Sequence, residues 1–139
     1  MSQPPPPSLR TGKICYLEIA AQDVHESATF YERAFEWNIR SGDTDRPSFD
    51  DTTGQISGAW VRDRVPDAEP GILPYIMVAD AVDAVRRVVA AGGTVVLPPG
   101  EHGTEVIATF LDPAGNLMGI YQQPGLADTE LSDGDASPD

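Results

Sequence analysis

An internal repeat constrains the fold of this chain more than any other feature. The segment from Asp112 to Tyr121 has an earlier counterpart from Asp51 to Trp60, with Asp, Gly and Gly at matching positions. Each copy begins with residues typical of a turn. The Asp side chain can accept a hydrogen bond from the backbone two residues later, and Gly tolerates positive φ. Apolar and β-branched residues flank each turn. The pattern therefore predicts a β-hairpin in each half of the chain.

The repeat also extends upstream of the two hairpins. Residues 14–21 and 71–78 each have the composition of a strand, and Asp23 and Asp80 each stand where a helix N-cap is expected. The second copy carries four more residues between the helix and the hairpin. Each half is therefore a strand, a helix and several strands. Neither half can bury its apolar face alone, so the sequence predicts one domain with a shared core.

Spacing and turn residues add detail within the second half. We expect a buried helical stripe of Val82, Val85 and Val89. A short strand over residues 94–97 is expected to stop at the Pro-Pro-Gly sequence that follows.

Composition shifts predict where the ordered part begins and ends. A Pro-rich start and an acidic end without periodicity indicate disordered termini around one domain. The predicted segments are an arm over 1–12, a domain over 13–123 (module one 13–61, linker 62–71, module two 72–123) and a tail over 124–139.

The charge and cysteine content exclude several function classes. The net charge is −13, with nine basic residues, which argues against binding a nucleic-acid backbone. No apolar run is long enough to cross a membrane, and no signal-peptide pattern is present. Cys15 is the single cysteine, so an intramolecular disulfide is impossible. We expect a cytoplasmic protein that binds neither nucleic acid nor membrane.

Side-chain alternation sorts each strand into two faces. In the first strand the consistently apolar set is expected to meet the helix: Cys15, Leu17 and Ile19. The opposite, concave face then carries Tyr16, Glu18 and Ala20. Aligning the two modules assigns further residues to the concave face: Leu73, Tyr75 and Met77 in the second module's first strand, and Ile56, Gly58, Trp60, Leu117, Gly119 and Tyr121 after the turns.

The paired modules, residues 30–37 (FYERAFEW) and the turn from Asp112 to Asn116 resemble the vicinal oxygen chelate superfamily. That superfamily includes glyoxalase I, bleomycin-resistance proteins and extradiol dioxygenases. The resemblance covers about residues 13–122. It implies an α+β fold of two βαβββ modules that form an open cup around a small-molecule site, commonly in a homodimer.

The resemblance also locates the superfamily's metal ligands. Metal-binding members place His or Glu at four positions, which fall here on Tyr16, Gly58, Leu73 and Gly119. A divalent ion needs at least three oxygen or nitrogen donors that converge, and these residue types cannot supply them. We therefore expect no metal site at these positions and no cofactor.

The two histidines lie elsewhere. His25 is early in the first helix and is expected to be exposed. His102 is in a Gly-rich loop close to Glu101 and Glu105, where no helix aligns the donors. Solvation is the favoured interpretation for His102, and a role for His102 or Glu105 stays open.

The concave face supplies the candidate site, whose aromatic side chains suit a flat organic ligand. The candidate ligand-binding residues are Tyr16, Glu18, Gly58, Trp60, Leu73, Tyr75, Met77 and Tyr121. Glu18 is also the candidate catalytic residue, since a carboxylate in an apolar cleft can act as a general base or anchor a cation. The alternative is that Glu18 is solvated or paired with an arginine.

Two function hypotheses follow. The favoured one is a glyoxalase/bleomycin-resistance-like binding protein that holds a small apolar or aromatic molecule without the usual metal ligands. The alternative is an enzyme: a metal-dependent lyase, isomerase or dioxygenase of the superfamily, or a metal-free enzyme with Glu18 as general base. The sequence leaves the identity of the ligand open.

Overall fold

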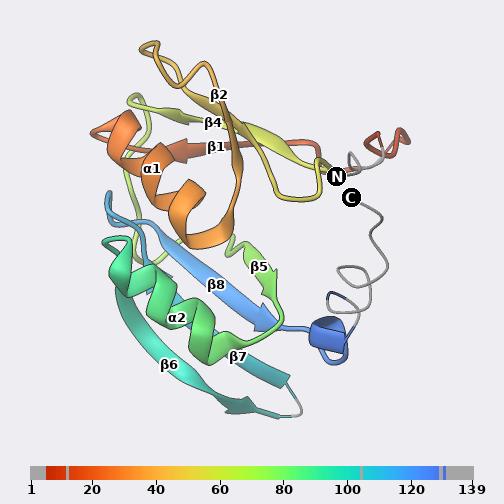
Figure 1. Cartoon of the computed structure of the whole chain (residues 1–139). Coiled ribbons are helices and arrows are strands. Elements are labelled where there is room, and N and C mark those ends of the chain that lie inside the picture. The colour runs from red at the N-terminus through yellow and green to blue at the C-terminus, as the bar shows by residue number, and fades with distance from the viewer. Residues whose placement is uncertain (1–5, 12, 104, 129, 131–139) are drawn as a thin grey trace.

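The computed structural model describes residues 6–11, 13–103, 105–128 and 130, and shows two four-stranded sheets, each with one helix (Figure 1). The first module contains β1 (Tyr16–Ala20), α1 (Val24–Phe35), β2 (Asn38–Arg40), β3 (Ser48–Asp50) and β4 (Ser57–Val61). The second contains β5 (Tyr75–Val78), α2 (Ala81–Ala90), β6 (Thr94–His102), β7 (Glu105–Leu111) and β8 (Leu117–Gln122).

Both sheets have the same topology. The strand order is β1-β4-β3-β2 in the first sheet and β5-β8-β7-β6 in the second. In each, the first strand runs parallel to the last strand of its module, and the other pairs are antiparallel. The predicted α+β fold of two βαβββ modules is confirmed. Figure 1 shows the modules one above the other, with α1 and α2 on the same side.

The helices begin where the sequence predicts. The Asp23 carboxylate accepts hydrogen bonds from the backbone N–H groups of His25 and Glu26, at 3.1 and 3.0 Å. The Asp80 carboxylate accepts one from the N–H of Asp83, at 3.1 Å. Each cap satisfies donors that would otherwise lack a partner, which fixes the start of the helix.

Aromatic side chains of α1 join the two modules in one core. The ring of Phe110 on β7 lies 5.8 Å from the ring of Phe30 and 5.7 Å from that of Phe35, measured between centroids. All three side chains are buried. The helix of the first module therefore packs against the sheet of the second, as a shared core requires.

A buried carboxylate in the second hairpin turn reinforces this junction. Asp112 is 4% exposed, and its Oδ2 accepts a hydrogen bond from the Tyr31 hydroxyl of α1 at 2.9 Å. Asn116 donates from Nδ2 to the same carboxylate at 2.9 Å and to the backbone oxygen of Ala20 at 2.7 Å. The turn thus bonds to both α1 and β1 of the first module.

The two hairpin turns differ by one residue. In the first turn the N–H of Asp51 donates to the oxygen of Ile56, whereas in the second the N–H of Asp112 donates to the oxygen of Asn116. The offset between the copies is therefore one residue smaller after the turns than before them. A one-residue shift moves every side chain of a strand to the opposite face.

The prediction that Gly58 and Trp60 share a face with Tyr16 is wrong for this reason. Gly58 pairs with Leu17, and Trp60 pairs with Ile19, so both lie on the face packed against the helices. Trp60 is 2% exposed, between the rings of Tyr31 and Phe49. The opposite face, called the open face below, carries Ser57, Ala59 and Val61 from β4.

The predicted helical stripe of α2 is wrong for two of its three residues. Val82 and Val89 are 58% and 55% exposed, whereas Val85 is half-buried and packs against the core. The fully buried residues of α2 are Ala81, Ala84 and Val88. The cap at Asp80 sets the start of α2, and the small alanines turn toward the sheet, which allows a close approach.

The strand expected to stop before the Pro-Pro-Gly sequence continues through it. β6 extends to His102, with register shifts between Val95 and Leu97 and between Leu97 and Gly100. Because β6 is an edge strand, a proline there removes no hydrogen bond to a second neighbour.

The predicted disordered termini fall partly outside the described residues, namely at 1–5, 12, 129 and 131–139. Where the arm is described, Ser8 donates from its backbone N–H to Oε1 of Gln55 at 3.1 Å. This bond attaches residues 6–11 to the first hairpin turn.

The substitution Tyr31→Phe tests the junction between the modules. It leaves a buried carboxylate oxygen with one donor fewer, so the free energy of unfolding should fall by about 1–3 kcal/mol, measured in urea. Tyr75→Phe, at a tyrosine 49% exposed, is the control and should cost less than about 0.5 kcal/mol. Equal effects would contradict the role of Tyr31.

Alkaline pH gives a second measurement on the same variant. Burial, and then the nearby Asp112, raise the pKa of Tyr31 well above 10.0. A raised pKa contributes stability that is complete below about pH 10 and is lost as pH rises toward the folded-state value. The stability difference between wild type and Tyr31→Phe should therefore narrow above about pH 10. A difference that grew with pH would be evidence against the assignment.

Candidate functional site

The open face carries large apolar side chains that the core does not use. Tyr16 on β1 is 52% exposed, and Tyr75 and Met77 on β5 are 49% and 57% exposed. Tyr121 on β8 is half-buried and pairs with Met77, so it lies on the same face. Exposed apolar groups on one sheet face indicate a contact surface for another molecule.

Gly119 makes room for one of these rings. It pairs with Tyr75, and a Cβ atom added to it would lie 2.5 Å from the Tyr75 ring. The ring therefore lies against the backbone of β8, as aromatic side chains do beside a glycine on the neighbouring strand. The position that holds a metal ligand in relatives here accommodates the side chain of Tyr75.

The predicted site residues do not all line one cavity. Tyr16 borders a cavity of about 430 Å³ at the start of β1. Glu18 borders a cavity of about 180 Å³ under the linker, and Met77 borders one of about 340 Å³ between the modules. Leu73 precedes β5 and is half-buried. Gly58 and Trp60 lie in the core.

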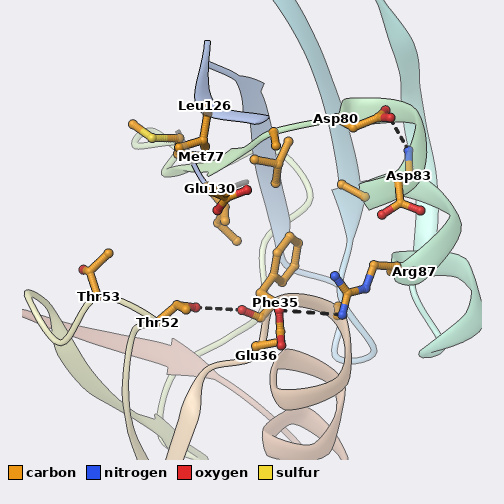
Figure 2. Close-up of a pocket in the computed structure, with 15 residues that line it drawn as sticks. Phe35, Glu36, Thr52, Thr53, Met77, Asp80, Asp83, Arg87, Leu126 and Glu130 are labelled. Carbon is orange, nitrogen blue, oxygen red and sulfur yellow. Dashed lines mark hydrogen bonds and ion pairs between the residues drawn. The ribbon is translucent and has the colours of Figure 1, made fainter. Parts of the chain in front are cut away.

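The cavity at Met77 combines an apolar wall with an acidic rim (Figure 2). Phe35, Met77 and Leu126 supply apolar surface, and the rim carries Glu36, Asp80, Asp83 and Glu130 together with Arg87. Three of these carboxylates already have partners: Asp80 caps α2, Asp83 pairs with Arg86 at 3.2 Å, and Glu36 lies 3.9 Å from a nitrogen of Arg87. The pair between Glu36 and Arg87 joins the ends of α1 and α2 across the junction.

Glu18 pairs with an arginine of the linker, which was the alternative left open by the sequence. Its Oε1 accepts hydrogen bonds from Nε and Nη2 of Arg64, at 3.0 and 2.7 Å. These bonds raise the pKa of Arg64. To take a proton from a ligand, this oxygen would first have to release Arg64.

The residues at the superfamily's metal positions do not fit a divalent ion. Tyr16, Leu73 and Gly119 stand at three of them, and the register places Ala59 rather than Gly58 on the open face. Within the described part of the chain, no group of three or more His, Cys, Asp or Glu is arranged to hold a metal ion. His25 is exposed on α1, and the side chain of His102 lies outside the described residues.

Sequence reasoning missed the surroundings of Cys15. It was expected to face the helix, but β1 begins one residue later and Cys15 is exposed. It borders the same cavity as Tyr16, together with Arg10 of the arm and Lys13 at the start of the domain. No local pattern predicts this arrangement, because it depends on where the arm folds back.

No helix among the described residues is long and apolar enough to cross a membrane.

The paired modules and the open face define a protein of the vicinal oxygen chelate fold. A family model described as a glyoxalase-like domain matches residues 16–121, which covers both modules. The chain therefore belongs to the glyoxalase-like domain family, and the predicted superfamily is confirmed.

Solved structures share this fold at low sequence identity. A hypothetical protein, SA1046 from S. aureus, has a TM-score of 0.67 at 18% identity over 82% of this chain and 95% of its own. A glyoxalase/bleomycin resistance protein/dioxygenase family enzyme from Burkholderia phytofirmans has a TM-score of 0.64 at 21% identity, over 76% of this chain and 94% of its own. A member of the same superfamily from Sphaerobacter thermophilus has a TM-score of 0.64 at 16% identity, over 83% of this chain and 100% of its own. Comparison with curated protein sequences finds no match.

Alanine substitutions at Gly58 and Gly119 should separate the roles of these two glycines. A Cβ atom at Gly58 would collide with the backbone oxygen of Leu17 and the buried ring of Phe49, so Gly58→Ala should lower stability by about 1–3 kcal/mol. At Gly119 it would meet Tyr75, whose exposed ring can swing away, so Gly119→Ala should cost less than about 1 kcal/mol. Urea unfolding measures both, and a larger loss at Gly119 would contradict the assignment of faces.

Proposed function

We propose that this protein binds a small apolar or aromatic molecule on its open face and does so without a metal ion at the superfamily's positions. The observation that carries the proposal is the exposure of Tyr16, Tyr75 and Met77 on that face, each close to half or more. Aromatic and thioether side chains give a flat, polarisable surface that suits a planar organic ligand.

Tyr75 and Tyr121 form the centre of the proposed surface in the second module. They occupy neighbouring parallel strands, and Met77, two residues after Tyr75 on β5, pairs with Tyr121 on β8. Leu73, just before β5, extends the apolar surface toward the linker. Gly58 and Trp60 are not included, because both are buried under α1.

Binding is favoured over catalysis by the residue types at the site. Tyr, Ala, Leu and Gly at the four superfamily positions give too few donors for a catalytic metal. Glu18, the one carboxylate considered as a general base, bonds to Arg64. Both bonds go to Oε1 and direct this oxygen toward the linker, whereas a general base points at the proton that it removes.

We further propose that a second copy of the chain covers part of the open face, so that the working form is a cytoplasmic homodimer. Val65 of the linker and Ile72, directly after it, are 88% and 83% exposed and line the same cavity as Glu18. Apolar groups exposed to this degree are commonly covered in an assembly.

Substitution of the two tyrosines tests the proposed surface. Tyr75→Ala and Tyr121→Ala should each weaken the affinity for 2-naphthamide, a neutral planar probe, by about three- to tenfold, because an aromatic contact contributes about 0.5–1.5 kcal/mol. Isothermal titration calorimetry measures the Kd. Val89→Ala, which removes an exposed apolar side chain from α2, should leave it unchanged. Absence of binding by the wild type, or equal effects of all three variants, would refute the proposal.

Metal titration tests the second half of the proposal. Purified protein incubated with Ni²⁺, Zn²⁺, Mn²⁺ or Fe²⁺ and then desalted should retain far less than one ion per chain, measured by mass spectrometry of the elements. A chelator should leave the Kd of 2-naphthamide unchanged. An ion retained at one per chain that also altered this Kd would show that metal belongs to the site after all.

A further inference from the structure

The cavity at the start of β1 differs from the other cavities in its charge. It measures about 430 Å³ and is bounded by the arm, by the beginning of β1 and by the first hairpin turn. Arg10 and Lys13 line it, and none of the described residues that line it is acidic. The whole chain has 22 acidic and nine basic residues. A wall with two cations and no carboxylate is therefore unusual for this molecule.

The cavity in Figure 2 provides the contrast. Four carboxylates and one guanidinium surround it, and the guanidinium already lies beside Glu36. At the arm, within the described residues, neither Arg10 nor Lys13 forms an ion pair. The two cations are thus available to an anion from outside.

Local bonds bring the two cations to the cavity. Ser8 donates from its backbone N–H to Oε1 of Gln55 at 3.1 Å, and Lys13 donates from its backbone N–H to the oxygen of Arg10 at 3.2 Å. The first bond holds the arm against the hairpin turn. The second brings the backbones of Arg10 and Lys13 together just before β1. The arm is therefore part of the cavity wall.

Two carboxylates bond to residues that line this cavity, and both have partners. Asp50 accepts a hydrogen bond from the Ser57 hydroxyl at 2.6 Å and pairs with Arg40 at 3.1 Å. Asp51 accepts bonds from the N–H of Gln55 at 2.9 Å and from the hydroxyl of Thr53. Neither carboxylate is paired with Arg10 or Lys13, so both cations keep their donors for another group.

Tyr16 gives the same cavity an aromatic wall. Its side chain is 52% exposed on the open face. Ser57, which pairs with Tyr16 from β4, also lines the cavity and carries a hydroxyl group. A cavity of this size accommodates a molecule of one or two fused rings. A cation beside an aromatic surface suits a planar molecule that carries a negative charge.

We infer that this cavity recognises an aromatic carboxylate, with Arg10 and Lys13 binding the anionic group and Tyr16 packing against the ring. The inference rests on the proposed function and goes further by assigning the ligand a negative charge and placing that charge at the arm. Cys15, exposed at the same cavity, is the sole cysteine and serves as a reporter of occupancy.

The test compares two probes of the same shape on the full chain. 2-Naphthoate carries a carboxylate where 2-naphthamide carries a neutral amide. By isothermal titration calorimetry, wild type should bind 2-naphthoate about tenfold more tightly than 2-naphthamide. The double variant Arg10→Gln, Lys13→Gln should lose this preference and keep its affinity for the amide. The control Arg46→Gln, Arg62→Gln removes the same charge from two exposed arginines and should keep the preference.

The rate of Cys15 alkylation by iodoacetamide locates the bound probe. Saturating 2-naphthoate should slow the reaction several-fold in wild type and the control variant, and much less in the double variant. Equal affinity for both probes, equal losses in the two double variants, or an unchanged alkylation rate would overturn the inference. Binding of 2-naphthamide without preference would leave the proposed function intact, whereas binding of neither probe would refute both.

Discussion

The buried carboxylate of Asp112 is the interaction on which the arrangement of the two modules depends. It accepts backbone N–H bonds from Ala114, Gly115 and Asn116, which shape the turn, and a bond from the Tyr31 hydroxyl. A carboxylate that is 4% exposed is tolerable only with such a full set of donors. Because one donor comes from α1, the turn of the second module can complete its hydrogen bonds only when the first module is in place.

The repeat predicted the fold well and the faces only in part. The caps at Asp23 and Asp80, the two hairpins and the α+β class follow from local chemistry, which a single sequence shows directly. The face of Trp60 does not follow, because it depends on one additional residue in the first turn. That residue is visible only through the bond from Asp51 to Ile56. Periodicity fixes which residues share a face within a strand, but the phase between two strands is set by the turn.

The candidate site was harder to predict for a related reason. Tyr16, Tyr75 and Met77 were found because alternation within β1 and β5 is a local property. Contacts across long sequence distances were not found, although two of them determine the chemistry of the site. The bond from Arg64 to Glu18 joins the linker to β1, and that from Ser8 to Gln55 joins the arm to the first turn. Neither the linker nor the arm has a periodicity that specifies where it folds back.

The two modules have diverged in the character of their open faces. In the second module Tyr75, Met77 and Tyr121 make that face apolar. In the first module the same face carries charged pairs, Glu18 with Arg64 and Arg40 with Asp50. A symmetric ligand would not bind more tightly because of this difference, since its two identical halves would meet one apolar and one charged surface. A molecule with one apolar end and one charged end fits it, because each end can lie against the module that solvates it better. The asymmetry of the repeat therefore favours a ligand whose two ends differ in polarity, and it comes from strand faces rather than from the arm.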